Sequence, residues 1–169
     1  MTRASAAVAA IACVLLVGCE SSSKSPWRRK LTKAERSAWV TKCGVPVGKV
    51  EVDIGKNREE NDSYRGKADD TAGPAGALSV TCYLGWNRQL DRALYYHVLV
   101  DSVPRAVLRP DEIAPYVELI AAEVPAAVQP VVRLVARGKY QQVRSGAFAV
   151  TGGFAHDPAM WSLMVEDLR

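Results

Sequence analysis

Leu94-Tyr95-Tyr96-His97-Val98-Leu99-Val100 is the stretch of this 169-residue chain that best indicates how it folds. Its side chains alternate between two faces, so that Tyr95, His97 and Leu99 share one of them. A period of two predicts a β-strand with one buried face. The side chains that we expect on the buried face are Leu94, Tyr96, Val98 and Val100.

Further strands are predicted on both sides of this stretch. Residues 78–86 show the same alternation, and the polar residues 87–92 between the two are compatible with a hairpin turn. The alternating patterns of 45–54 and 160–168 also predict strands, and 141–154 predicts a strand or a hairpin arm. The polar, glycine-containing residues between 55 and 76 predict a long loop or the end of a hairpin with disordered content.

Three helices are predicted from start signals and helical spacing. Thr32 and Glu35 fit a capping box, which predicts a helix over 32–42 with Gly44 as its stop. Pro110 and the two acidic residues after it open a second helix. A third helix is predicted over 126–138, where Pro130 could displace the start.

The order of these elements indicates the fold class. A helix is followed by three strands, two helices and two further strands, without strict alternation. This order predicts an α+β fold, in which an antiparallel sheet of about five strands has helices packed on one face.

The N-terminus carries an export signal. Arg3 supplies a positive charge, and residues 4–17 are apolar except for Ser5. The run ends at Leu16-Val17-Gly18-Cys19, which resembles the lipobox of bacterial lipoproteins. The resemblance implies that Cys19 receives a diacylglyceryl group and becomes the mature N-terminus after cleavage behind Gly18. It implies a chain held by membrane lipid on the outer face of the cytoplasmic membrane. An ordinary secretory signal is the alternative.

The lipobox interpretation divides the chain into a signal peptide (1–18), a flexible tether rich in serine and basic residues (19–31) and one globular domain (32–169). Such a tether would let the domain stand about 20 Å from the bilayer. Trp27 could either touch the membrane interface or dock on the domain. The basic residues near the anchor could meet anionic lipid head groups, or could belong to a merely soluble linker.

Two cysteines remain in the predicted domain. Cys43 is expected at the end of the first helix, and Cys82 points to the buried face of a strand. An even pair in an exported domain predicts a Cys43–Cys82 disulfide. The two cysteines and the two distant histidines lack the spacing of a zinc site, so no metal is expected.

His97, and His156 with its neighbour Asp157, are the weak candidates for chemistry. His97 lies on the central strand, where a solvated or hydrogen-bonded histidine needs no catalytic role. His156-Asp157-Pro158 is typical of a turn. The sequence has no Gly-x-Ser-x-Gly elbow, Walker loop or Rossmann fingerprint, so we expect no cofactor and assign no catalytic residue.

Composition limits the function classes further. Hydrophobic residues make up 49% and charged residues 24%, as in an ordinary globular protein, and the net charge is +4. No basic stripe with aromatic residues follows Lys42, which argues against nucleic-acid binding. The sequence favours a non-enzymatic lipoprotein that binds an envelope protein or a cell-wall component. The alternatives are an envelope hydrolase that uses His97 or His156, and a small-ligand carrier with a pocket lined by Trp86, Tyr95 or Trp161.

Overall fold

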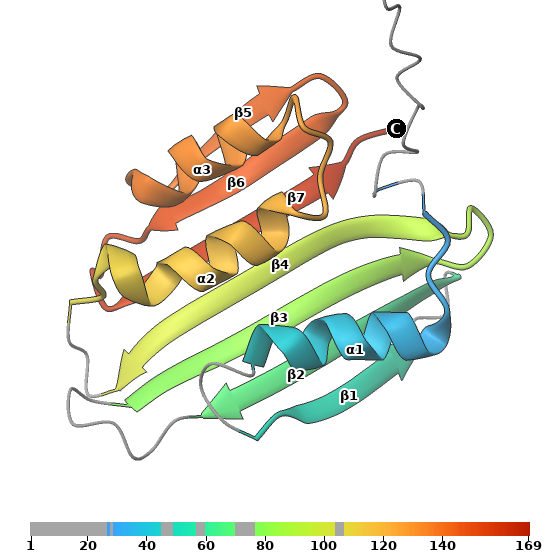
Figure 1. Cartoon of the computed structure of the whole chain (residues 1–169), viewed down its shortest axis with the longest axis horizontal. Coiled ribbons are helices and arrows are strands. Elements are labelled where there is room, and N and C mark those ends of the chain that lie inside the picture. Colours follow the sequence, from blue (N-terminus) through green and yellow to red (C-terminus); the bar gives the residue numbers. More distant parts are fainter. Residues whose placement is uncertain (1–26, 28, 45–48, 57–59, 70–76, 104–106) are drawn as a thin grey trace, which may run out of the picture.

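The computed structural model describes residues 27, 29–44, 49–56, 60–69, 77–103 and 107–169. These residues form three helices and seven strands in one antiparallel sheet, with the strand order β1-β2-β3-β4-β7-β6-β5 (Figure 1). The helices are α1 (Lys33–Gly44), α2 (Pro110–Ala121) and α3 (Gln129–Arg137). The strands are β1 (Glu51–Lys56), β2 (Asn61–Asp69), β3 (Ala77–Asn87), β4 (Arg92–Val103), β5 (Gln141–Ser145), β6 (Phe148–Phe154) and β7 (Met160–Asp167).

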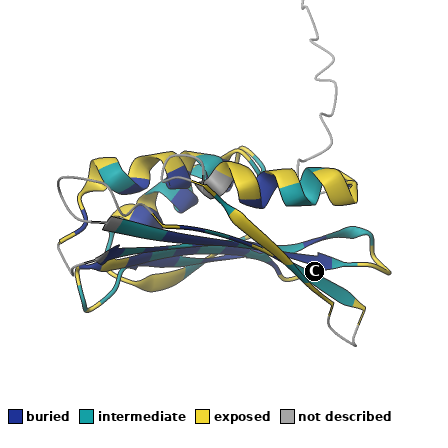
Figure 2. Cartoon of the chain, turned by 90° about the horizontal axis from the view of Figure 1, so that it is seen from below, coloured by how far each residue is buried: buried dark blue, intermediate teal, exposed yellow. Residues whose placement is uncertain are grey.

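The predicted α+β class with an antiparallel sheet is confirmed, whereas the predicted count of about five strands is too low. Figure 2 shows the three helices together on one side of the sheet. Helix α1 contacts β1, β2 and β3, while α2 and α3 contact the other half of the sheet. The apolar side chains that face the helices form one core.

The largest correction concerns β2, a nine-residue strand inside the segment 55–76, for which a long loop or a hairpin end was predicted. This strand contributes only Tyr64 and Ala68 as buried apolar side chains. Gly66 stands between them, because a Cβ at this position would lie 2.5 Å from the carbonyl oxygen of Val40 on α1. The close approach of the helix therefore removes the apolar residue that would have completed the alternation.

The second missed strand comes from the segment 141–154, which is a hairpin of β5 and β6. Its turn contains Gly146, whose φ of 60° lies in the left-handed region that favours glycine. The segment was predicted as one strand or one hairpin arm, whereas it forms both arms of a hairpin. Segment 160–168 is confirmed as a strand.

One residue of the central strand departs from its predicted face. The register between β3 and β4 shifts at Gly85/Trp86, so that Tyr95 pairs with Gly85 and Ala93 pairs with Trp86. Leu94 is the extra residue of this bulge and is half-buried, while Ala93 takes the buried position. A bulge of this kind reverses the alternation locally and cannot be read from the strand alone.

The helix boundaries follow their capping chemistry. Glu35 N donates to Thr32 Oγ1 at 3.2 Å, and Thr32 N donates to the Glu35 carboxylate at 2.7 Å, which confirms the capping box. Helix α3 begins at Gln129 rather than at residue 126. Pro130 lies in its first turn, where its missing N–H costs no helical hydrogen bond.

Trp27 is part of the domain. Its side chain is 1% exposed, and its ring packs edge-on against Tyr96 at 4.9 Å and against Phe148 at 5.2 Å between ring centroids. Leu31 is also buried. The last residues of the predicted tether thus pack on the domain, and of the two predicted roles of Trp27, docking on the domain is the one observed.

Candidate functional site

The side chains of the central strands point to two different environments. On the helix side, most of the apolar residues that the strands β3, β4 and β7 contribute are at most 2% exposed. Tyr83, Tyr95, His97, Leu99 and Met164 alternate with them and are only half-buried. Figure 2 shows that no helix of the described part of the chain covers the side of the sheet opposite the helices.

We call this uncovered surface the open face. Its centre is formed by alternating residues of β3, β4 and β7, which pair across the strands in the order Tyr83, His97, Met164 and, in the next row, Thr81, Leu99, Ser162. Charged residues of β2 and β7 stand at its margins, and they are Arg65, Lys67, Asp69 and Glu166.

Side chains of the open face pack on one another. The rings of Tyr83 and His97 stack, with their centroids 5.6 Å apart and their planes 21° apart. The ring of Tyr95 occupies the space beside Gly85, where a Cβ would collide with it. The surface is therefore an ordered aromatic layer.

His97 is an apolar contact residue in this layer. Burial against its neighbours lowers the pKa of His97 below its ordinary value. Within the described part of the chain, no hydrogen bond or ion pair involves its ring. A general base is commonly oriented by a hydrogen-bonded partner, and the described residues around His97 hold no such partner.

His156 and Asp157 lie elsewhere, in the turn between β6 and β7, which confirms the predicted turn. The Asp157 carboxylate accepts a hydrogen bond from Ala159 N at 3.0 Å, and Met160 N donates to the carbonyl oxygen of Asp157 at 3.0 Å. These bonds are typical of a turn built on an aspartate. The two predicted histidines thus belong to separate surfaces of the domain.

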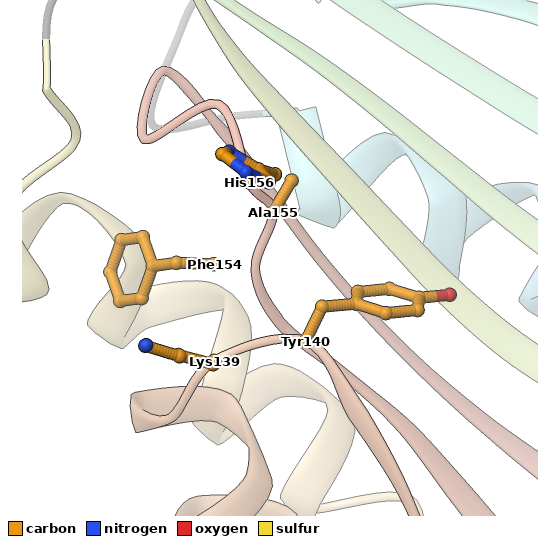
Figure 3. Close-up of a pocket in the computed structure, with 5 residues that line it drawn as sticks. All are labelled: Lys139, Tyr140, Phe154, Ala155 and His156. Atoms are coloured by element: carbon orange, nitrogen blue, oxygen red, sulfur yellow. The ribbon is translucent and has the colours of Figure 1, made fainter.

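His156 borders a hollow that the sequence did not predict. Its volume is about 810 Å³, and its described lining residues are Lys139, Tyr140, Phe154, Ala155 and His156 (Figure 3). Backbone hydrogen bonds hold its floor, from Phe154 N to Gly138 O at 2.9 Å and from Tyr140 N to Phe154 O at 2.8 Å.

The lining side chains of this hollow do not converge on one point. In Figure 3, Lys139 and Phe154 extend to one side of the chain and Tyr140 to the other. Tyr140 is also 57% exposed. The hollow therefore offers apolar surface with a nearby ammonium group, without the convergent polar groups of a catalytic centre.

Within its described residues, the structure does not contain the pocket that the sequence suggested for a small-ligand carrier, lined by Trp86, Tyr95 or Trp161. Trp86 and Trp161 are buried in the core, and Trp161 Nε1 donates to the carbonyl oxygen of Ala136 at 2.8 Å. Tyr95 stands on the open face instead. These three residues therefore do not line a common pocket between sheet and helices. A smaller groove of about 390 Å³ lies between α1 and α2, beside Trp39 and Glu123.

The cysteines are described only in part. Cys82 is fully buried on β3, opposite Gly66 of β2, and is disulfide-bonded. Its partner lies outside the described side chains, as does the side chain of Cys43 at the end of α1. The lipobox and Cys19 also lie outside the described residues. Within the described part, no helix is long and apolar enough to cross a membrane, and no three His, Cys, Asp or Glu side chains cluster as metal ligands would.

Sequence reasoning missed Tyr83 and Met164 as members of the candidate surface. Both alternate with buried residues in predicted strands, so their side of the sheet was predictable. The hairpin predicted from residues 78–86 and 94–100 places Tyr83 on the strand beside His97. The proximity of Met164 was not predictable, because it depends on β7 lying beside β4.

No family model, curated protein or solved structure matches this chain.

Proposed function

We propose that this protein is a bacterial lipoprotein, anchored through Cys19 on the outer face of the cytoplasmic membrane. Its domain is a non-enzymatic binding module for an envelope protein or a cell-wall component. The open face is the binding surface. The observation that supports this role most directly is the row of Tyr83, His97 and Met164 on a side of the sheet that no described helix covers.

The composition of the open face supports binding. An antiparallel sheet with one solvated face usually carries polar side chains there. Here tyrosine, histidine, leucine and methionine stand beside threonine and serine at the centre, and together they offer apolar contact area and hydrogen-bonding groups. Aromatic residues and methionine are enriched in protein interfaces, and a charged margin is typical of an interface rim.

A small-ligand carrier is the second candidate, and the hollow beside His156 is the observation that favours it. Its volume of about 810 Å³ lies within the range of pockets that hold small molecules. The ammonium group of Lys139 and the ring of Phe154, which extend to the same side of the chain, would suit a small molecule with an anionic and an apolar part.

Site-specific photo-crosslinking in the producing bacterium tests the open face as the binding surface. A photoreactive phenylalanine analogue at Tyr83 is expected to form one defined adduct, whereas the analogue at Leu134, which is 68% exposed on α3, is not. Both variants keep the anchor and therefore sample the same compartment. Equal labelling from both positions, or adducts from Leu134 alone, would contradict the assignment of the open face.

A further inference from the structure

One end of the molecule collects the points where the chain enters and leaves the domain. The start of α1, the β3–β4 turn, the β5–β6 turn and the C-terminus lie at this end, on the right of Figure 1. We call it the hairpin end. Contacts tie its parts together, because Lys30 Nζ lies 2.9 Å from the Asp91 carboxylate and Leu168 N donates to Ala147 O at 2.9 Å.

Trp27 fixes how far the domain can stand from a lipid on Cys19. Since the indole is buried against Tyr96 and Phe148, only the residues between positions 19 and 27 can act as a tether. Fully extended, they span at most about 29 Å. A flexible chain of this length has a typical end-to-end distance of about 16 Å.

Because the sheet is long, its two ends differ in their distance from a lipid on Cys19. Phe148, the first residue of β6, pairs with Asp167 near the C-terminus, so Trp27 docks close to the hairpin end. Strand β4 has 12 residues and is therefore about 40 Å long. The opposite end, where Val107 lies, could approach the bilayer only if the tether were stretched along the side of the domain.

The surface of the hairpin end suits a lipid interface. Leu90 is 57% exposed in the β3–β4 turn, and Leu168 is 41% exposed beside the C-terminus. The turn is held in shape, because Leu90 N donates to Asn87 Oδ1 at 2.7 Å and Asp91 takes a φ of 49°. Leu90 therefore projects into solvent from an ordered turn.

Basic side chains flank these leucines. The side chains of Lys30, Arg88 and Arg169 are 80%, 46% and 36% exposed. Each of these cations has an acidic partner within the protein, because Lys30 lies 2.9 Å from Asp91, Arg88 lies 3.6 Å from Asp62 and Arg169 lies 2.7 Å from Asp167. The Asp167 carboxylate is buried, whereas the side chains of the three cations reach solvent. Apolar tips with flanking cations are typical of protein surfaces that rest on anionic lipid.

We propose that the hairpin end rests on the anionic phospholipid bilayer that holds Cys19, with Leu90 at the boundary of the acyl chains. This inference rests on the proposed lipid anchor. In this orientation the strands point away from the membrane. The open face is then steeply inclined to the membrane plane and is accessible to a partner in the envelope. The basic side chains contact lipid phosphates in this arrangement.

Fluorescence quenching on the lipidated full-length protein tests this orientation. Leu90→Cys and the matched far-end variant Val107→Cys, both at exposed positions, receive an environment-sensitive label. The proteins are reconstituted in vesicles of phosphatidylcholine and phosphatidylglycerol that carry a head-group quencher. Quenching at position 90 is expected to exceed that at position 107 at least about twofold, because the first label lies ~5–10 Å inside the interface and the second roughly 40 Å away.

Equal quenching at the two positions, or stronger quenching at position 107, would overturn the orientation. The intact mass of the same samples distinguishes a wrong orientation from a missing lipid anchor. A lipidated mass with this unfavourable quenching result refutes the orientation alone, whereas a mass without lipid refutes the anchor and the orientation with it.

Discussion

The rings of Tyr83 and His97 stack on the open face of the sheet, with their centroids 5.6 Å apart. They belong to neighbouring strands and are directly paired in the register of β3 and β4. Since an aromatic pair of this kind stabilises its own arrangement, the centre of the open face is ordered before any partner arrives. A preorganised surface loses less conformational entropy on binding than a flexible one.

Burial of His97 predicts how its ring titrates. The neutral imidazole is favoured in the folded protein, so the pKa of His97 should lie below 6.5, the ordinary value. The His156→Gln variant leaves a single histidine, because the chain contains two, and its ring signals can be followed by NMR as the pH is lowered. A measured pKa at or above 6.5 would contradict the burial of this ring.

The same shift predicts a pH dependence of stability. Because the unfolded chain binds a proton more readily than folded His97 does, the free energy of unfolding should fall as the pH falls through 6.5 towards the lower pKa of the folded state. Denaturant unfolding of the wild type and of His97→Gln measures this difference at neutral and acidic pH. The variant should lose part of the acid sensitivity, and an identical pH profile would refute the prediction.

Gly66→Ala should destabilise the domain. The added Cβ would lie 2.5 Å from Val40 O, so α1 must move away from β2. The expected loss is about 1–3 kcal/mol in the free energy of unfolding. Gly55→Ala is the matched control on β1, since the nearest atom to its Cβ would be Ser63 O at 3.9 Å. If both variants unfold at the same denaturant concentration, the close contact between Gly66 of β2 and Val40 of α1 is refuted.

Trp27→Ala should cost about 3–5 kcal/mol, because a large side chain leaves the aromatic contact with Tyr96 and Phe148. Leu134→Ala, at a position that is 68% exposed, serves as the control and should change stability little. Thermal unfolding of both variants measures the difference. An unchanged unfolding temperature for Trp27→Ala would contradict the packing of Trp27 on the domain.

The predicted Cys43–Cys82 disulfide has a thermodynamic consequence. Helix α1 contacts β3, and Cys82 of β3 is fully buried, so the bond would join the helix to the sheet. Reduction should lower the free energy of unfolding by roughly 4 kcal/mol on the loop-entropy model. Peptide mapping without reductant should find the two cysteines in one linked fragment. A linked fragment that contains Cys82 without Cys43 would refute the pairing.

The sequence predicts the central part of the fold well, because there each strand carries a complete apolar alternation. Residues 78–86 and 94–100 lie inside β3 and β4, and the turn between them is where the polar segment indicated it. Strand β2 has no such signal, since Gly66 replaces an apolar side chain where α1 approaches. Tertiary contact thus overrides the local pattern on which the prediction depends.

The candidate surface was predictable only in part. Alternation places Tyr95, His97 and Leu99 on one face of their strand, as observed apart from the bulge at Leu94. Whether helices cover that face depends on how the chain crosses the sheet, which no local pattern records. The hollow likewise depends on a single bridge between Lys139, which follows α3, and Phe154, the last residue of β6, and no local pattern indicates that these two residues pair.

The lipid anchor and the disulfide are tested together by the intact mass of protein extracted from membranes, measured with and without reductant and with Cys19→Ala as control. We predict the mass of a chain that begins at Cys19 and carries diacylglycerol, with two free thiols that appear only after reduction. The control should lack the lipid mass. An unlipidated mass for the wild type, or free thiols without reductant, would contradict the account of an anchored, disulfide-bonded lipoprotein.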